Sequence, residues 1–150
     1  MPISYHHHMA AVVETEPELD VFMKHSSVPL LFDAGHMAFA GGDNLRVIDN
    51  HHARISHVHT KDIRKKVVEK IDRTRNSFLD AVVMGVFTVP GDGDLNFSSI
   101  IAALEGVGYE GWFVVEAEQD PKLNSPREMA SLGHRVLSEL FSKSGYSVEI

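Results

Sequence analysis

The sequence predicts an α/β protein built as a partial (β/α)8 TIM barrel, with about four βα units in a single domain over residues 1–150. Three observations predict this fold. Short, wholly apolar runs such as LLF and WFVV are typical of parallel strands that are buried on both faces. Amphipathic segments with helical spacing separate these runs, and repeated βα units imply parallel strands. A polar residue capable of binding a metal follows most runs, as at the carboxyl ends of barrel strands.

The first unit is expected to join a strand near residues 3–5 to a helix that begins after Thr15. Thr15 and Glu18 have the spacing of a capping box, in which each side chain bonds the backbone N–H of the other. Behind this cap, one helix face collects the apolar side chains Leu19, Phe22 and Met23.

The second unit is expected to have its strand at residues 30–32. The two glycines and the aspartate of GGD predict a loop and then an N-cap at Asp43. A short helix that carries Leu45 and Ile48 would follow.

The third unit is expected to have its strand at residues 55–58, followed by two short helices within residues 63–84 and a break at residues 73–77. The stretch TVPGDGDLNF is rich in Gly, Pro and Asp and predicts a loop. The next helix carries Ile100, Ile101 and Leu104 and should end at a glycine of EGVGY. Helical spacing within residues 63–84 relates Ile63, Val67 and Ile71, and then Phe78, Leu79 and Val82.

The fourth unit is expected to have its strand at residues 112–115 and to end in a long helix. Ser125 would cap this helix, with Pro126 in its first turn and Glu128 as the capping-box acid. Its apolar face would hold Met129, Leu132, Val136, Leu137 and Leu140.

The composition excludes several classes of partner and site. With 21 acidic against 14 basic residues and a net charge of -7, the chain lacks the basic surface that nucleic acids or anionic membranes require. Because there is no cysteine, any metal must be held by histidine and carboxylate, which suits Mn, Co, Fe, Zn or Mg. The longest apolar run, residues 81–90, is too short to cross a bilayer. We therefore expect a soluble, cytoplasmic protein without nucleic-acid or membrane partners.

Candidate metal ligands stand where the predicted strands end. Asp33 and His36 lie in LLFDAGH, His57 and His59 in ISHVHTKD, and Glu116 in GWFVVEAE. Because the carboxyl ends of parallel strands meet at one edge of a sheet, these ligands should converge. The pattern predicts a divalent metal site.

Each of these residues also has a purely structural interpretation. Asp33 could cap a turn, with His36 on the surface. His57 and His59 share a strand face, so they could be a packed, hydrogen-bonded pair instead of one ligand and one substrate contact. Glu116 and Glu118 share a face as well, and one could pair with an arginine.

Two further groups could contribute charge to the same pocket. Lys61 and Asp62 directly follow the histidine strand. In YHHHM, alternation along a strand points His6 and His8 one way and His7 the other, so at most two of the three face the pocket.

Longer blocks of the chain resemble a known enzyme family. These blocks are YHHHM, LLFDAGHMAFAGGD, ISHVHTKD, SFLDAVVMGVFTVPGDGDLNF and GYEGWFVVEAEQDP. They resemble the second half of the inosose dehydratases, the 2-keto-myo-inositol dehydratases of inositol catabolism. GVFTVPGDGD and VVEAEQDP are the most distinctive blocks. The resemblance implies the C-terminal half of a xylose isomerase-like TIM barrel, with strands 5–8 present.

By this resemblance, Asp33, His59 and Glu116 occupy the metal-ligand positions of strands six, seven and eight. His36 and His57 fall at neighbouring pocket positions. Many members of the wider superfamily have a glutamate ligand at the end of strand five, where this chain has YHHHM. His6 or His8 is expected to replace it, and Glu118 remains an alternative to Glu116.

The implied activity is that of a carbon-oxygen lyase, which eliminates water from a polyol ketone with the help of Mn or Co and, by resemblance, glutathione. A bound divalent ion would stabilise the enolate that forms when a base removes the proton beside the ketone. His36, His57 and His8 are candidates for the base and the acid, and Lys61 for holding a substrate oxygen. Their roles stay open at this point.

The length of the chain departs from the family. Strands one to four precede the matched region in a family barrel, and four parallel strands alone leave two edges open. We therefore expect this chain to need the missing N-terminal half or to self-associate. Two other functions remain possible: a sugar isomerase or epimerase, which would retain the hydroxyl, and a non-catalytic metal-binding fragment.

Overall fold

The computed structural model describes residues 3–149 and contains a four-stranded parallel sheet in the order β1-β2-β3-β6. The strands are β1 Tyr5–His6, β2 Leu30–Asp33, β3 Ile55–His59 and β6 Phe113–Val114. Successive βα units therefore produce adjacent parallel strands, which confirms the α/β prediction. That these strands are numbers 5–8 of a barrel stays a prediction.

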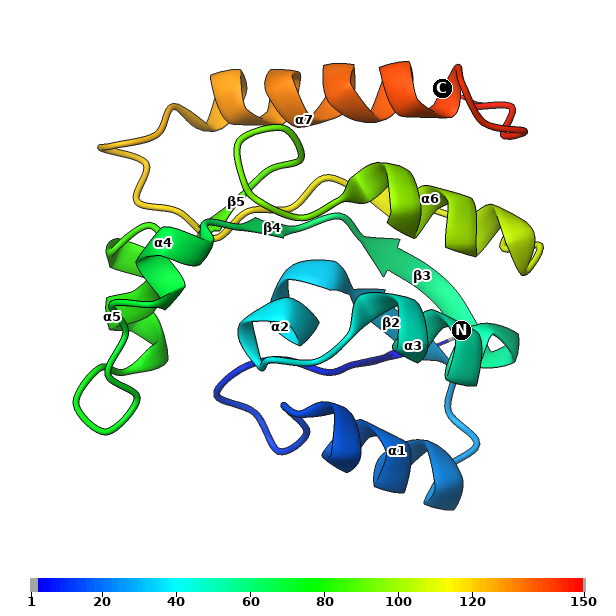
Figure 1. Ribbon diagram of the computed structural model, residues 1–150, viewed down its shortest axis with the longest axis horizontal. Helices are drawn as coiled ribbons and strands as arrows, with labels where there is room; N and C mark the ends of the chain where they lie inside the picture. The colour runs from blue at the N-terminus through cyan, green and yellow to red at the C-terminus, as the bar shows by residue number, and fades with distance from the viewer. Residues whose placement is uncertain (1–2, 150) are drawn as a thin grey trace.

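A row of helices packs on the sheet. In Figure 1 they run from α1 (Glu16–His25) at the bottom, through α3 (Asn44–His51) and α6 (Phe97–Gly106), to α7 (Pro126–Phe141) at the top. Their apolar residues and those of the sheet form one core. Buried members of this core include Leu19, Phe32, Ile48, Val58, Leu104 and Leu137.

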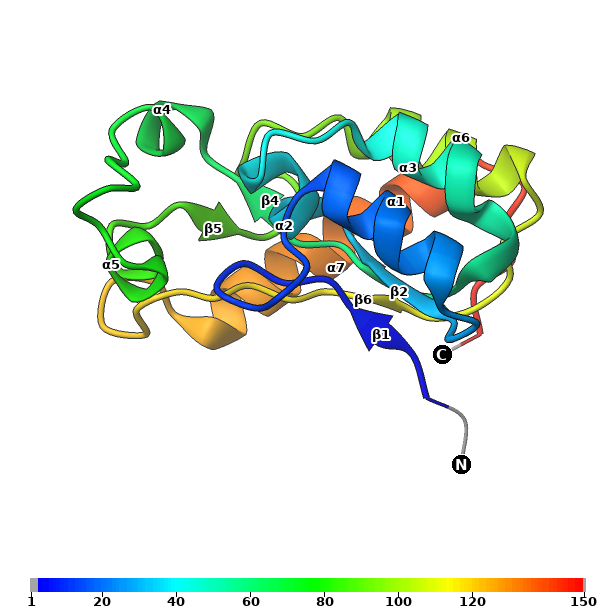
Figure 2. The same ribbon diagram turned by 90° about the horizontal axis from the view of Figure 1, so that it is seen from below.

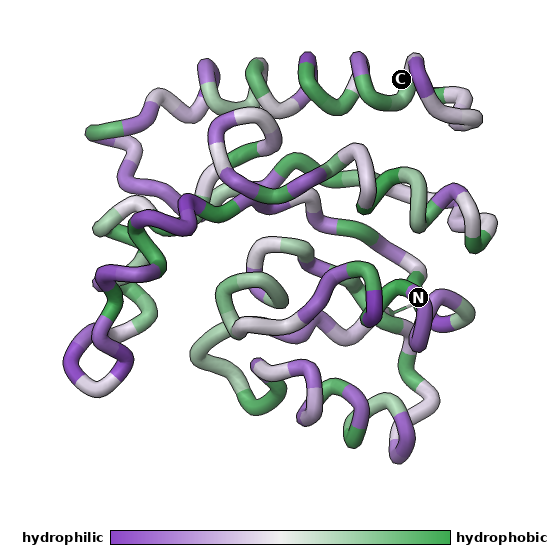
Figure 3. The backbone as a smooth tube through the Cα atoms, in the orientation of Figure 1, coloured by the Kyte–Doolittle hydropathy of each residue, from purple (hydrophilic) through white to green (hydrophobic). Residues whose placement is uncertain are grey.

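The amphipathic pattern of α7 explains which of its faces packs against the core. Figure 3 shows green, hydrophobic segments returning with each turn of this helix. Leu137 and Phe141 lie in the core, whereas the charged residues of the helix stay on its outer side. No helix within residues 3–149 is both long enough and apolar enough to cross a membrane.

The predicted caps are formed at two helices and not at a third. Thr15 and Glu18 make the capping box of α1, and Asp43 accepts hydrogen bonds from the first turn of α3. Ser125 precedes α7, but its side chain makes no capping hydrogen bond, so the prediction of a capping box there was wrong. Pro126 still occupies the first turn, where its missing N–H costs nothing.

Three short elements were not predicted. Helix α2 (Ala34–Phe39) begins directly after β2, and the strands β4 (Asp62–Ile63) and β5 (Phe87–Thr88) pair antiparallel as a second small sheet. Ile63 therefore lies in a strand and not in a helix. Helices α4 (Lys65–Val68) and α5 (Phe78–Val83) are the two predicted short helices. Figure 2 shows the small sheet at one end of the main sheet, with α4 and α5 beyond it.

Candidate metal centre

The ends of three neighbouring strands, β2, β3 and β6, bring the predicted ligands together. Asp33 and His59 are the last residues of β2 and β3 and are register partners, and Glu116 follows two residues after β6. Because the strands are parallel, all three side chains project from the same edge of the sheet. Asp33 and His59 are therefore held by backbone pairing as well as by side-chain contacts.

The ligand atoms of these residues have the spacing that a shared ion requires. Asp33, His59 and Glu116 each offer one atom within 4.8 Å of the others. His59 Nδ1 lies 2.6 Å from Glu116 Oε2 and 3.5 Å from Asp33 Oδ2. His6 Nε2 lies 3.3 Å from Asp33 Oδ2, and His6 forms a separate ligand group with Asp33 and His36. Imidazole and carboxylate donors of this kind suit a divalent transition metal.

Two of these atoms contact each other without forming a hydrogen bond of proper geometry. His59 Nδ1 and Glu116 Oε2 are both buried, and within residues 3–149 neither has a hydrogen-bond partner of proper geometry. Buried polar atoms in folded proteins are normally paired, because an unpaired one costs stability. The residues present therefore fit a metal ion, which would accept both lone pairs.

Asp33 carries two functions, one on each oxygen. Its Oδ1 accepts a hydrogen bond of 2.9 Å from the backbone N–H of His36 and so caps α2. Its Oδ2 faces the ligand cluster. The backbone N–H of Asp33 donates to Nε2 of the buried His7, at 3.2 Å. The turn-capping interpretation and the ligand interpretation of Asp33 are thus compatible.

A second group of polar side chains lies beside the first. His8, His36 and Glu118 offer ligand atoms that are also within 4.8 Å of one another. His36 is fully buried, not on the surface, and the rings of His8 and His36 are 3.8 Å apart. The Lys61 ammonium donates to His36 Nε2 and to Glu118 Oε2, at 2.7 Å each. Lys61 is therefore part of this polar cluster and is fully buried.

Opposite charges set the protonation states in the cluster. Burial would raise the pKa of Asp33, but His59, His6 and Lys61 hold it well below its usual range. Burial would lower the pKa of His59, yet the carboxylates of Asp33 and Glu116 raise it to about 9. Burial likewise opposes the charge of Lys61, and the same carboxylates outweigh it and raise the pKa of Lys61. The carboxylates of the cluster therefore stabilise positive charge on the groups beside them.

Burial lowers the pKa of three further histidines near the cluster. Burial lowers the pKa of His36 to about 2 and that of His7 to about 4. His57 lies two residues before His59 on the same strand face, and the centroids of the two rings are 5.5 Å apart. The pKa of His57 is lowered chiefly by burial. It belongs to none of the ligand groups found within residues 3–149.

Asp62 and His7 both form hydrogen bonds with the backbone that the sequence did not predict. Asp62 does not face the cluster; its Oδ1 accepts the backbone N–H groups of Ile63 and Leu95. His7 is fully buried and its Nε2 accepts a hydrogen bond from the backbone N–H of Asp33, a contact that was not predicted. No sequence signal separates such a supporting histidine from a packed one.

Comparison with known proteins places this geometry in a family. The family described as xylose isomerase-like TIM barrel matches residues 13–140. The inosose dehydratase of Geobacillus thermodenitrificans (strain NG80-2) is 48% identical over 142 residues, which cover 93% of this chain and 48% of that protein. The rhizopine catabolism protein MocC of Rhizobium meliloti is 46% identical, over 96% of this chain and 45% of that protein. The predicted resemblance is confirmed.

Solved structures give the same fold at low identity. The IOLI protein with a binding zinc atom has a TM-score of 0.69 at 17% identity and covers 98% of this chain and 51% of that chain. The probable 3-DHS dehydratase AsbF from Bacillus anthracis has a TM-score of 0.60 at 16% identity, over 92% and 49%.

The chain spans about half the length of the curated relatives it matches. That this half is the C-terminal one stays a prediction. With the family match extending over most of its residues, the chain belongs to the xylose isomerase-like TIM barrel family.

Proposed function

We propose that the chain is part of a metal-dependent dehydratase that removes water from 2-keto-myo-inositol. One observation carries the proposal: the convergence of Asp33, His59 and Glu116 at the strand ends of a chain that is 48% identical to an inosose dehydratase. Since the chain spans about half of that relative, the activity of the whole protein is part of the proposal.

Asp33, His59, Glu116 and His6 would hold the metal, which we propose to be Mn²⁺ or Co²⁺. A structural neighbour of this fold has zinc bound. The ion would supply Lewis-acid stabilisation of the negative charge that develops on the ketone oxygen. All four donors are nitrogen or oxygen atoms, as these borderline metals prefer.

His8 is the best-placed general base. Its Nδ1 lies 2.6 Å from the carbonyl oxygen of Met9, which can only accept, so Nδ1 carries the proton and donates it there. In the neutral ring this tautomer leaves Nε2 with a free lone pair, on the pocket side that faces Glu118. A base needs such an exposed acceptor within reach of the proton beside the ketone.

Lys61 is the best-placed donor for the departing hydroxyl. Carboxylates keep it charged, and its Nζ already donates to two acceptors in the pocket. His36 fits a supporting function, because its Nε2 accepts from Lys61 and its pKa is too low for it to carry a proton near neutrality. His57, which lies two residues before His59 in β3, would contact the substrate.

The remaining conditions follow from the family resemblance. We propose a cytoplasmic enzyme whose open sheet edges are covered by an N-terminal half or by a second copy of the chain. By the family resemblance, we propose glutathione as a thiol cofactor of the reaction. The substrate is a small polyol ketone, and the pocket offers the hydrogen-bond donors and acceptors that hydroxyl groups require.

The test is an assay of the metal-free chain with 2-keto-myo-inositol after addition of Mn²⁺ or Co²⁺, with and without glutathione. We expect metal-dependent loss of one water from the substrate, detected by mass spectrometry, and loss of this activity in Asp33→Asn. Lys65→Met, which changes an exposed lysine outside the cluster, should keep it.

Other products would identify the alternatives. An isomer of equal mass would indicate a sugar isomerase or epimerase. Metal binding without any turnover, also after mixing with an N-terminal half from a relative, would indicate a non-catalytic metal-binding fragment. Either result would refute the proposed dehydratase.

A further inference from the structure

Lys61 occupies a position that would otherwise be a metal site. Its side chain has no solvent exposure, and its ammonium lies 2.7 Å from both His36 Nε2 and Glu118 Oε2. Both of these atoms belong to the ligand group formed with His8. The ammonium therefore sits among the donor atoms that would surround a second ion.

The three donors have a recognised metal-binding chemistry. Two imidazoles and one carboxylate form a set that binds divalent transition metals and leaves positions open for water or substrate. His36 Nε2 lies 3.4 Å from Glu118 Oε2, and His8 Nε2 lies 3.6 Å from Glu118 Oε1. Such separations are those expected between ligands that are each about 2 Å from one ion.

The pocket also needs a cation at this point when no second metal is bound. Lys61 Nζ lies 3.3 Å from Glu116 Oε2 and 3.6 Å from Asp33 Oδ2, in addition to its contact with Glu118. Buried carboxylates without a compensating charge are costly. The Phe87 ring, with its centroid 5.3 Å from Nζ, adds a cation–π contact.

From this arrangement we propose that the ammonium of Lys61 is a resident cation that occupies a second metal position, and that removal of its charge opens a site for a divalent ion at His8, His36 and Glu118. The ligand would be a borderline divalent metal such as Co²⁺ or Zn²⁺. A fixed monovalent charge next to the first ion gives less repulsion than a second divalent ion would.

The experiment counts Co²⁺ ions bound to the metal-free 150-residue chain by equilibrium dialysis and elemental analysis. The wild-type chain should bind one ion, and Lys61→Met should bind two. Lys61→Met combined with His8→Ala should return to one. Lys65→Met, which removes an exposed lysine charge, should bind one ion like the wild type.

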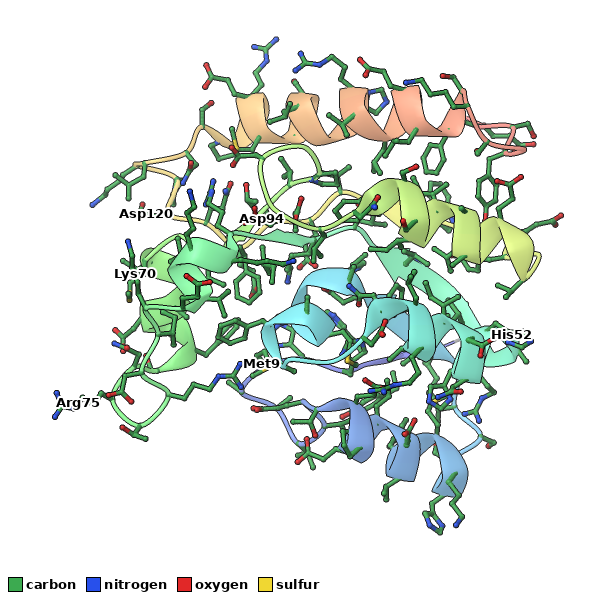
Figure 4. All side chains as sticks on the ribbon, in the orientation of Figure 1. Met9, His52, Lys70, Arg75, Asp94 and Asp120 are labelled. Carbon is green, nitrogen blue, oxygen red and sulfur yellow. The ribbon has the colours of Figure 1, made fainter. Side chains whose placement is uncertain are left out.

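The His8 variant separates the new site from adventitious binding elsewhere. His52, for example, lies at the opposite end of the sheet from Met9, the neighbour of His8 (Figure 4). An extra ion that survives His8→Ala would overturn the inference, and so would equal binding by the wild-type chain and Lys61→Met.

The inference rests on the proposed metal centre only for the first ion, and the two can fail separately. A wild-type chain that binds no ion would remove the proposed centre, whereas one additional ion in Lys61→Met that depends on His8 would still support the second site. If Lys61→Met is unfolded without metal, its circular dichroism is followed during Co²⁺ addition. Recovery that requires His8 supports the inference, and no recovery overturns it.

Discussion

Gly35 lies against the aliphatic stem of Lys61 so closely that a Cβ on residue 35 would stand 2.6 Å from Lys61 Cγ and 2.8 Å from Lys61 Cβ. Real Cβ atoms do not approach other heavy atoms this closely. Because Lys61 is fully buried, its stem cannot swing into solvent to make room. The glycine of DAGH is therefore required by the path of the Lys61 side chain into the pocket.

We expect Gly35→Ala to lower the free energy of unfolding by about 1–3 kcal/mol, as overpacking of a tight interior does. The matched control is Gly106→Ala at the end of α6, where a Cβ would meet nothing within 4 Å. Replacing that helical glycine should stabilise the chain by about 0.5–1 kcal/mol. Urea denaturation measures both, and a neutral Gly35→Ala would contradict the proposed packing.

The two glutamates of VVEAE should differ in their effect on metal affinity. Glu116 Oε2 is 2.6 Å from His59 Nδ1, whereas Glu118 pairs with Lys61. Glu116→Gln should weaken Co²⁺ binding more than about 100-fold, because it removes a ligand. Glu118→Gln should weaken it by about 10-fold, as loss of a supporting contact does. Isothermal titration calorimetry decides, and the reverse order would make Glu118 the ligand.

The positions of the candidate metal ligands were predictable from the sequence because they depend on strand topology alone. Asp33 and His59 end apolar runs that become neighbouring parallel strands, and Glu116 follows the next one. Once the strands are parallel and adjacent, residues at their carboxyl ends must meet. Spacing along the chain was thus sufficient to bring these three side chains to one edge.

The burial of the Lys61 and His36 side chains was not predictable in the same way. Helix α2 is only six residues long, and its sequence AGHMAF has no polar face that would reveal it. The strands β4 and β5 are only two residues long, and they pair although they are far apart in the sequence. No local sequence pattern predicts such a pairing. These elements bury Lys61 and His36, so their burial is a tertiary effect.

An ion pair between the buried Glu16 and the exposed Arg46 joins the beginnings of α1 and α3. Glu16 is 4% exposed, and its carboxylate accepts from the Arg46 guanidinium at 2.7 Å and from the backbone N–H of Asp43 at 3.0 Å. Hydrogen bonding to Arg46 lowers the pKa of Glu16 below its ordinary value. No local sequence pattern indicates this pair, whose members are 30 residues apart.

We expect Arg46→Met to lower the free energy of unfolding more than a surface pair would, since it removes a charged hydrogen bond and leaves the Glu16 carboxylate without its partner. Arg75→Met provides the control. Arg75 pairs with Asp72 at 3.7 Å on the surface, where such pairs contribute about 0.5 kcal/mol or less. Thermal unfolding should separate the two variants clearly, and equal melting temperatures would show that the Glu16 pair adds nothing.

Asp62 carries the clearest pH dependence outside the candidate metal ligands. It is 1% exposed, and burial raises its pKa from 3.8 to about 6, with Asp94 nearby adding to the increase. Its Oδ1 accepts the backbone N–H groups of Ile63 and Leu95, at 2.7 and 2.9 Å, and so fastens β4 to the loop before α6.

Because the folded pKa of Asp62 lies above its unfolded value, the folded chain holds this proton where the unfolded chain has released it. Stability contributed by the protonated carboxyl is therefore complete below about pH 4 and is lost as the pH rises to about 6, by about 3 kcal/mol in total. Asp62→Asn keeps an oxygen for both N–H groups and cannot ionise. Urea unfolding at pH 4, 5, 6 and 7 should show the variant gaining stability relative to the wild type across this window. A difference that stays constant with pH would mean that Asp62 is ionised in the fold throughout.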